Sequence, residues 1–132
     1  MKGVDTNVLV RFLIRDDERQ AQIALEAIAK AVETGEALAI SLLVLLETEW
    51  VLRSVYRFEK RSVIDVFTSL LESRDVRIES EEALEEALLH YESGGADFAD
   101  CLFVAQYRTL GCETMLTFDA RAGDVPGAER LA

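Results

Sequence analysis

Short apolar runs alternate along this chain with longer segments of helical periodicity, and this alternation constrains the fold more than any other feature. Short apolar runs bounded by polar residues are typical of buried strands, and apolar residues spaced three and four positions apart are typical of amphipathic helices. Strands that are separated by helices pair in parallel, and the helices then cover both faces of the sheet. Strands are expected at residues 2–5, 37–40, 76–79 and 113–118, with a weak fifth strand in the terminal AERLA.

The expected helices carry residues at their ends that commonly start or stop a helix. Ser41 and Ser80 stand at N-cap positions, and Gly35 and Gly94 stand where two helices end. The helices are expected at residues 7–15, 18–35, 41–58, 61–73, 81–93 and 97–111. In the second of these, the expected buried stripe consists of Ile23, Ala24, Ala27, Ile28, Ala31 and Val32.

The composition fits a single domain. The chain has 132 residues, half of them hydrophobic, with one proline and no low-complexity linker, so one domain is expected over residues 1–132. Its 14 basic and 25 acidic residues give a net charge of −11. This charge argues against loose, charge-driven binding to nucleic acid or to an anionic membrane. It does not exclude a nucleic-acid enzyme whose carboxylates carry metal ions, and a basic partner protein also fits.

The cysteines and the apolar segments favour a cytoplasmic protein without a membrane anchor. Cys101 and Cys112 lie roughly 16 Å apart if one helix covers residues 97–111, which is too far for a disulfide. Two reduced thiols fit the cytoplasm. The start of the chain becomes polar too soon for a secretory signal, and Glu47 and Glu49 interrupt the most apolar stretch before it reaches membrane-spanning length.

Acidic residues collect where the expected strands end. Asp5 ends the first strand and Asp119 follows the fourth, while Asp97 and Asp100 open the helix that leads into the fourth. Glu47 lies two turns into the helix that follows the second strand. Ligands of such sheets bind beyond the carboxyl ends of the strands, so we expect these acids to converge at one edge. Hard divalent cations prefer oxygen ligands, and the pattern therefore predicts a site for Mg²⁺ or Mn²⁺.

Each acid also has a purely structural interpretation. Asp5 and Asp119 could begin turns, and Asp97 could cap the helix that follows it. Asp100 is harder to explain in this way, because the positions three, four and seven residues later are apolar or aromatic and predict a buried helix face. Those positions are Phe103, Val104 and Tyr107.

The two glutamates of the third expected helix are predicted to differ in environment. Glu49 has Arg53 four residues later, which predicts a routine surface ion pair. Glu47 shares a face with Leu43 and Trp50 and has no basic residue within a turn. A buried glutamate without a partner is either protonated or coordinated, and we favour coordination.

Other chemistries find little support in the residues. The only histidine, His90, lies in an acidic helix, and the two cysteines lack the spacing of zinc ligands. A serine or cysteine nucleophile would have to use the same histidine, and no glycine-rich phosphate loop is present. A phospho-aspartate hydrolase or receiver needs a lysine near the phosphate, yet none follows a strand end. The lysines are Lys2, Lys30 and Lys60.

Four blocks of the sequence resemble PIN-domain proteins, and most closely the VapC-type toxins of bacterial and archaeal toxin–antitoxin pairs. The blocks are VDTNVLVRFL, ISLLVLLETEWVLRSVY, GADFADCLFVA and TFDARA, which occur in this order and cover nearly the whole chain. The resemblance implies a single PIN domain with a three-layer α/β fold. In that fold a central, mostly parallel sheet of four to five strands has helices on both faces.

The same resemblance implies an endoribonuclease that depends on Mg²⁺ or Mn²⁺ and hydrolyses RNA phosphodiesters with a metal-activated water. It also implies a homodimer and a small VapB-like antitoxin that inserts a basic segment into the acidic groove. By position, the family's catalytic and metal-binding quartet falls on Asp5, Glu47, Asp100 and Asp119, with Asp97 as an auxiliary metal ligand. Supporting polar residues fall on Thr6, Asn7 and Thr117. The fourth block is the loosest in this family, so Asp119 rests on the weakest match.

Two other interpretations stay open beside the ribonuclease. One is a catalytically inactive PIN-like module that binds a partner protein, and the other is the phospho-aspartate protein considered above. A complete set of acids favours the ribonuclease, since an inactive module has no need of it. Arginines could contact the RNA backbone, although each is more simply explained as a solvated helix charge. They are Arg11, Arg15, Arg53, Arg57 and Arg108.

Overall fold

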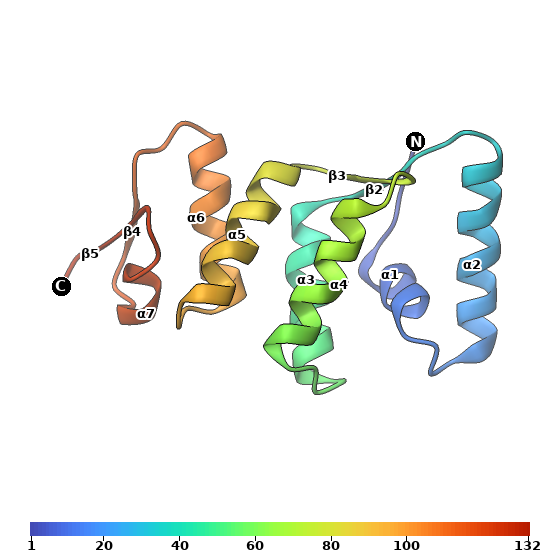
Figure 1. Ribbon diagram of the computed structural model, residues 1–132, viewed down its shortest axis with the longest axis horizontal. Coiled ribbons are helices and arrows are strands. Elements are labelled where there is room, and N and C mark those ends of the chain that lie inside the picture. The colour runs from blue at the N-terminus through green and yellow to red at the C-terminus, as the bar shows by residue number, and fades with distance from the viewer. The chain divides into compact units, whose positions relative to one another are not determined.

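Residues 1–132 are described by a computed structural model, with seven helices and five strands along the chain (Figure 1). The chain divides into two compact units, Met1–Glu79 and Ser80–Ala132. We call them the N-terminal unit and the C-terminal unit and describe each by itself. None of the seven helices combines the length and the apolar character that crossing a membrane would need.

Three short parallel strands form the sheet of the N-terminal unit in the order β1-β2-β3. They are β1 (Lys2–Gly3), β2 (Leu38–Ile40) and β3 (Val76–Ile78). Lys2 lies opposite Leu38, and Leu38 lies opposite Val76. Because the strands run in the same direction, their carboxyl ends meet at one edge of the sheet, and the helices that follow β1 and β2 begin at that edge.

Side-chain caps start most helices of the N-terminal unit. The helices are α1 (Thr6–Leu13), α2 (Glu18–Glu33), α3 (Leu42–Ser54) and α4 (Lys60–Glu72). Asp17 accepts a hydrogen bond from the backbone N–H of Gln20 at 3.0 Å, and Ser41 accepts one from that of Val44 at 3.1 Å. The predicted N-cap Ser41 is therefore confirmed, and it satisfies a donor that the first turn of α3 leaves unpaired.

The apolar core of the N-terminal unit is built from β2, α3 and α4. Ile40, Leu45, Leu52, Val63 and Phe67 are each at most 2% exposed. Leu45 and Leu52 stand seven residues apart, and Val63 and Phe67 stand four apart, so each pair lies on one face of its helix. Burying one side chain of this size contributes about 1.5–3 kcal/mol.

The buried face of α2 matches the prediction only in part. Ala24 and Ala31 are buried as predicted, but Ile23 is 57% exposed, Val32 is 37% exposed and Ala27 is exposed too, so the prediction is wrong for these three residues. Alanines occur on several sides of this helix. The apolar period alone therefore does not settle which side packs against the unit.

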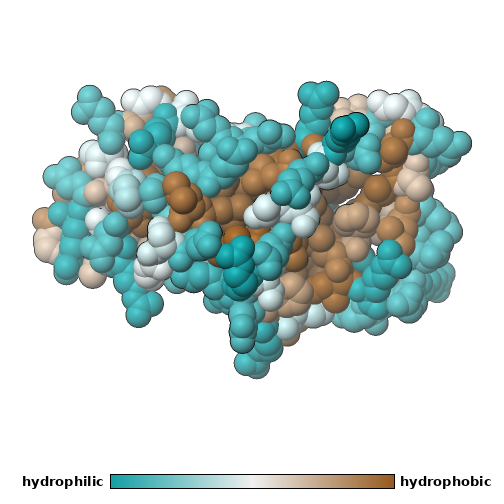
Figure 2. Space-filling view, viewed as in Figure 1, coloured by the Kyte–Doolittle hydropathy of each residue, from teal (hydrophilic) through white to brown (hydrophobic).

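Apolar side chains line a hollow in the N-terminal unit (Figure 2). Its volume is about 400 Å³, and its walls include Val8 and Phe12 of α1, Ile28 of α2 and Leu70 of α4. Well-packed interiors leave few voids larger than a water molecule. The apolar contact between α1 and its neighbours is therefore incomplete on this side.

The C-terminal unit contains a helical hairpin followed by a small parallel sheet. Its elements are α5 (Glu81–Ser93), α6 (Phe98–Thr109), β4 (Met115–Thr117), α7 (Ala120–Gly123) and β5 (Ala128–Arg130). Ser80 caps α5 as predicted, accepting a hydrogen bond from the Ala83 backbone N–H at 3.1 Å. Tyr91 of α5 meets Phe98 of α6 edge to face, with ring centroids 5.6 Å apart. Such aromatic pairs add to the stabilisation from buried area.

The predicted α/β class and the parallel pairing of strands are confirmed. All five expected strands are present, although each is only two or three residues long. They pair as a three-stranded and a two-stranded sheet, where one sheet of four to five strands was expected. The pairing of β4 with β5 is local, because only the four-residue α7 and short turns separate them. Neither cysteine forms a disulfide, as predicted.

The glycine before β5 is predicted to be intolerant of a side chain. Gly127 has a φ of +100°, and a Cβ there would lie 2.8 Å from Val104 Cγ1 and from the Arg108 guanidinium. Gly127→Ala should therefore lower the free energy of unfolding by about 1–3 kcal/mol, measured by urea denaturation.

Gly111→Ala is the matched control for this substitution. Gly111 has a φ of +89° but open space around it, so alanine there meets backbone strain without a clash. Its loss of stability should be the smaller, about 1 kcal/mol. Equal losses in the two variants would show that the contact with Val104 does not restrict this turn.

Candidate functional site

Asp5 stands where β1 leads into α1. It is the N-cap of α1, and its Oδ1 accepts a hydrogen bond from the Val8 backbone N–H at 3.0 Å. The side chain is exposed, and its second oxygen has no hydrogen bond within the chain. Thr6 beside it is buried, whereas Asn7 is exposed. The structural interpretation of Asp5 thus holds, and one carboxylate oxygen still faces solvent for a further ligand.

The prediction for the two glutamates of α3 is wrong as to their faces. Glu49 is 3% exposed, while Glu47 is exposed together with Leu43 and Trp50. The predicted ion pair of Glu49 with Arg53 is present, with 2.9 Å between Oε2 and Nε, but it is largely buried on the glutamate side. The first half of α3 is apolar on every side, so periodicity could not place its buried face. Burial therefore gives no support for metal coordination by Glu47, whose role as a metal ligand stays a prediction from the family resemblance.

Asp119 and Thr117 are coupled at the end of β4. Asp119 is the N-cap of α7 and accepts a hydrogen bond from the Ala122 backbone N–H at 2.8 Å. The backbone N–H of Asp119 donates to the Thr117 hydroxyl at 3.0 Å. Thr117 therefore holds the backbone of Asp119 in place, and its supporting role in a metal site stays a prediction.

Three acids interact at the start of α6 in the C-terminal unit. Asp97 occupies the N-cap position of α6, yet its side chain makes no capping hydrogen bond. Partial burial, followed by the negative charges of Asp119 and Asp97, raises the pKa of Asp100. No lysine or arginine forms an ion pair with any of the three, so their repulsion is uncompensated within the chain.

The buried face predicted around Asp100 is only partly correct. Val104 is 3% exposed, but Phe103 and Tyr107 are 39% and 43% exposed. Asp100 itself is half-buried. The core face of α6 runs through Phe98, Cys101 and Val104 instead, and Asp100 lies beside that face.

The five candidate acids are divided between the two units, with Asp5 and Glu47 in the first and the other three in the second. No group of three or more acidic, histidine or cysteine side chains is gathered closely enough to form a complete metal-binding set. The convergence of all five acids at one edge therefore stays a prediction. The donor chemistry fits Mg²⁺ or Mn²⁺, since the candidates are carboxylates and Mg²⁺ usually takes only one or two of them.

A groove lies beside Asp5 between α1 and α2. Its volume is about 380 Å³. Its polar wall includes Asp5, Asn7 and Arg11, and its apolar wall includes Ile23 and Ala27 of α2. The exposed isoleucine is therefore part of a concave surface next to a candidate ligand.

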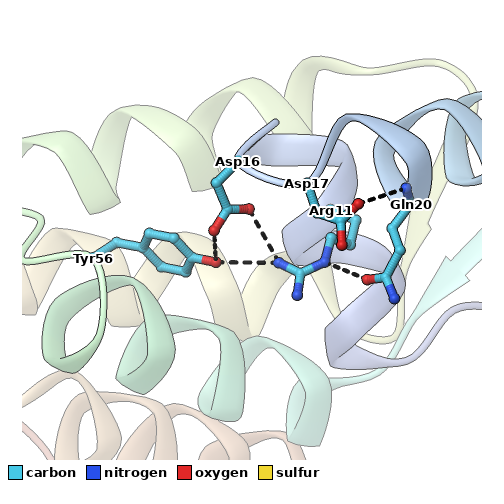
Figure 3. A network of polar contacts seen from close by, with 5 residues as sticks. All are labelled: Arg11, Asp16, Asp17, Gln20 and Tyr56. Carbon is cyan, nitrogen blue, oxygen red and sulfur yellow. Dashed lines mark hydrogen bonds and ion pairs between the residues drawn. The ribbon is translucent and has the colours of Figure 1, made fainter.

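A polar network at the far end of α1 was not foreseen from the sequence. Arg11 contacts Asp16, Gln20 and Tyr56, and Asp17 caps the helix that carries Gln20 (Figure 3). Only Arg11 had been singled out, as a candidate contact to RNA. Nothing in the periodicity of the chain connects Tyr56 with residues some forty positions earlier.

Comparison with known proteins identifies the family. The family model described as PIN domain matches residues 3–128. The chain belongs to the PIN-domain family. A similar protein is the VapC ribonuclease of Aquifex aeolicus (strain VF5), which is 26% identical over 121 residues, 92% of this chain and 89% of that protein. The resemblance drawn from the four sequence blocks is confirmed, and the family match runs through both units of this PIN-domain protein.

The pKa of Asp100 gives a direct test of the acidic cluster. Asp119→Asn removes one negative charge and should lower the pKa of Asp100 toward its ordinary value, because a neighbouring carboxylate disfavours a second ionised one. The pKa of Asp100 should stay somewhat raised in this variant, because the partial burial of the carboxyl group is unchanged. Carbon-13 NMR titration of the carboxyl groups measures this, with Asp124→Asn as the control. An unchanged Asp100 titration in Asp119→Asn would refute the coupling.

The buried ion pair of α3 predicts a loss of stability. Glu49→Gln keeps the shape of the side chain but removes the charge that meets Arg53, and should lower the free energy of unfolding by about 1–2 kcal/mol. Asp65→Asn is the control, since the pair of Asp65 with Arg61 is exposed on both sides and should matter little. Equal effects in urea denaturation would contradict the burial of Glu49.

Proposed function

We propose that this chain is a metal-dependent endoribonuclease and the toxin of a VapBC-type pair. Membership of the PIN-domain family supports this, and so does the similarity to the VapC ribonuclease of Aquifex aeolicus over most of both chains. The observation that carries the proposal is the cluster of Asp97, Asp100 and Asp119, whose charges repel one another without a cation of the chain to balance them. A divalent ion would relieve that repulsion.

We assign metal binding and catalysis to Asp5, Glu47, Asp100 and Asp119, with Asp97 as an auxiliary ligand. Their oxygen donors match the preference of Mg²⁺ and Mn²⁺. When bound, the metal would supply charge neutralisation at an RNA phosphate and activate water for its hydrolysis.

The chain's own residues would orient this site through the contacts already described. Asp5 and Asp119 each use one oxygen to cap a helix, which fixes the side chain and leaves the other oxygen for the ion. Thr117 fixes the backbone of Asp119. Thr6 and Asn7 are assigned a supporting role beside Asp5.

The charge of the chain suits the proposed partners. With a net charge of −11, the protein would depend on the metal to bridge its acids to the phosphates of RNA. A cognate VapB-like antitoxin with a basic segment would complement the same acids. We also propose a homodimer and a cytoplasmic location, the latter supported by two cysteines that form no disulfide.

Cleavage of structured RNA by purified protein tests the function. Activity should require added Mg²⁺ or Mn²⁺ and stop with chelator. Asp5→Asn, Asp100→Asn and Glu47→Gln should each lower the rate by roughly a hundredfold or more, since each removes a metal ligand. Glu49→Gln, assayed below its unfolding temperature, is the matched control and should stay near the wild-type rate.

Three outcomes would count against the proposal. Activity that survives chelator would indicate a contaminating nuclease or another chemistry. Binding of a partner without any RNA cleavage would favour the inactive module, and labelling of Asp5 by a small phosphodonor would favour the phospho-aspartate protein. As a readout independent of cleavage, added Mg²⁺ should lower the pKa of Asp100, because a nearby cation favours the carboxylate.

A further inference from the structure

Arg11 makes an unusually complete set of side-chain contacts for a residue of a short helix. Its Nε donates to Gln20 Oε1 at 2.6 Å, and its Nη1 donates to Asp16 Oδ1 at 3.1 Å and to the Tyr56 hydroxyl at 3.2 Å. The Tyr56 hydroxyl in turn donates to Asp16 Oδ2 at 2.9 Å. Figure 3 shows the guanidinium between these three partners, which come from different parts of the N-terminal unit.

Two of the partners, Gln20 and Tyr56, belong to segments that other hydrogen bonds also hold, whereas Asp16 lies in the loop between α1 and α2. Asp17 caps α2 through the backbone N–H of Gln20. Tyr56 follows the end of α3, and its backbone N–H donates to Val51 O at 3.3 Å. The next residue, Arg57, has a φ of 59° and turns the chain back. The network therefore ties α1 to the start of α2 through Gln20 and to the segment after α3 through Tyr56, with Asp16 of the intervening loop between them.

The helix α1 already packs against α2 and α3, and the network adds a polar tie to these contacts. The helix has only eight residues, and isolated helices of that length are marginal. Leu9 and Val10 are buried, but the hollow of about 400 Å³ borders the same helix. The Tyr56 hydroxyl, against opposing desolvation and with help from Asp16, raises the pKa of Arg11. Like any arginine, Arg11 is charged at every working pH.

The two helices that Arg11 connects carry the candidate ligands of the N-terminal unit. Asp5 is the N-cap of α1, and Glu47 lies in the middle of α3. The orientation of one helix against the other therefore sets the separation of the two carboxylates. We propose that Arg11 is a positioning residue, a brace that holds α1 and Asp5 in a fixed orientation relative to α3 and Glu47.

A brace of this kind matters for the proposed function, on which this part of the inference rests. Metal ions lose affinity when the groups that orient their ligands are removed, even though those groups do not touch the ion. The planar fork of arginine can hold three acceptors at fixed angles, which a lysine cannot reproduce. Arg11→Lys should therefore keep the positive charge on α1 but lose the simultaneous hydrogen bonds to Gln20, Asp16 and Tyr56.

The experiment compares variants that remove single contacts of the brace. Tyr56→Phe removes one hydroxyl, Gln20→Ala removes one acceptor and Arg11→Lys removes the fork. Gln22→Ala is the matched control, because Gln22 lies in the same helix and bonds only Glu26 at 3.0 Å. Two quantities are measured for each, the backbone residual dipolar couplings by NMR and the dissociation constant for Mn²⁺.

The wild type and Gln22→Ala should show couplings of α1 and α3 that fit one common alignment. In Tyr56→Phe and Arg11→Lys the couplings of α1 should depart from that fit, and the Mn²⁺ dissociation constant should rise roughly three- to tenfold. Gln20→Ala should give the same effects to a smaller extent.

Couplings that stay unchanged in all three brace variants would overturn the proposal. Altered couplings with an unchanged Mn²⁺ affinity would overturn the link to the metal ligands and leave Arg11 a merely structural residue. A wild type that binds no Mn²⁺ would refute the proposed function instead, and the dipolar couplings would then decide the brace by themselves.

Discussion

Parallel pairing of very short strands is the constraint on which the N-terminal unit depends. Backbone hydrogen bonds from Leu38 to Asp75 and from Glu79 to Ile40, both 2.9 Å, place β3 against β2. The carboxylate of Glu79 then accepts a hydrogen bond from the Leu42 backbone N–H at 3.0 Å. One strand end thus satisfies a backbone donor in the first turn of α3 and holds the start of that helix beside the sheet.

That dependence explains which parts of the site could be predicted from the sequence. Ser41 and Ser80 were correctly predicted as caps because a cap acts on its own helix within three residues. The strands and most helices were also predicted, since each has a local period. The exposed Glu47 and buried Glu49 were not, because α3 begins as an apolar run and its buried face is decided by packing against segments far away in the sequence.

The Arg11 network also could not be predicted from local sequence patterns. Asp16 and Tyr56 are brought together by the fold, and no motif or period marks either residue in the sequence. Two of the four blocks that indicated the PIN-domain family include Arg11 and Tyr56, but the resemblance assigned its functional roles to the acids of those blocks. The family resemblance identified the candidate acids. The contacts of the folded chain identified Arg11 as the residue proposed to position two of them, Asp5 and Glu47.

The acidic cluster of the C-terminal unit couples folding to the protonation of Asp100. The pKa of Asp100 is higher in the folded chain than its ordinary value, so the folded state takes up a proton before the unfolded state does. Falling pH through that range therefore favours folding at this position, opposite to the usual behaviour of a salt-bridged acid. An ion that binds only the folded cluster acts in the same direction by mass action. Such an ion would raise the conformational stability of the C-terminal unit, and the size of that increase would measure how tightly the folded unit binds it.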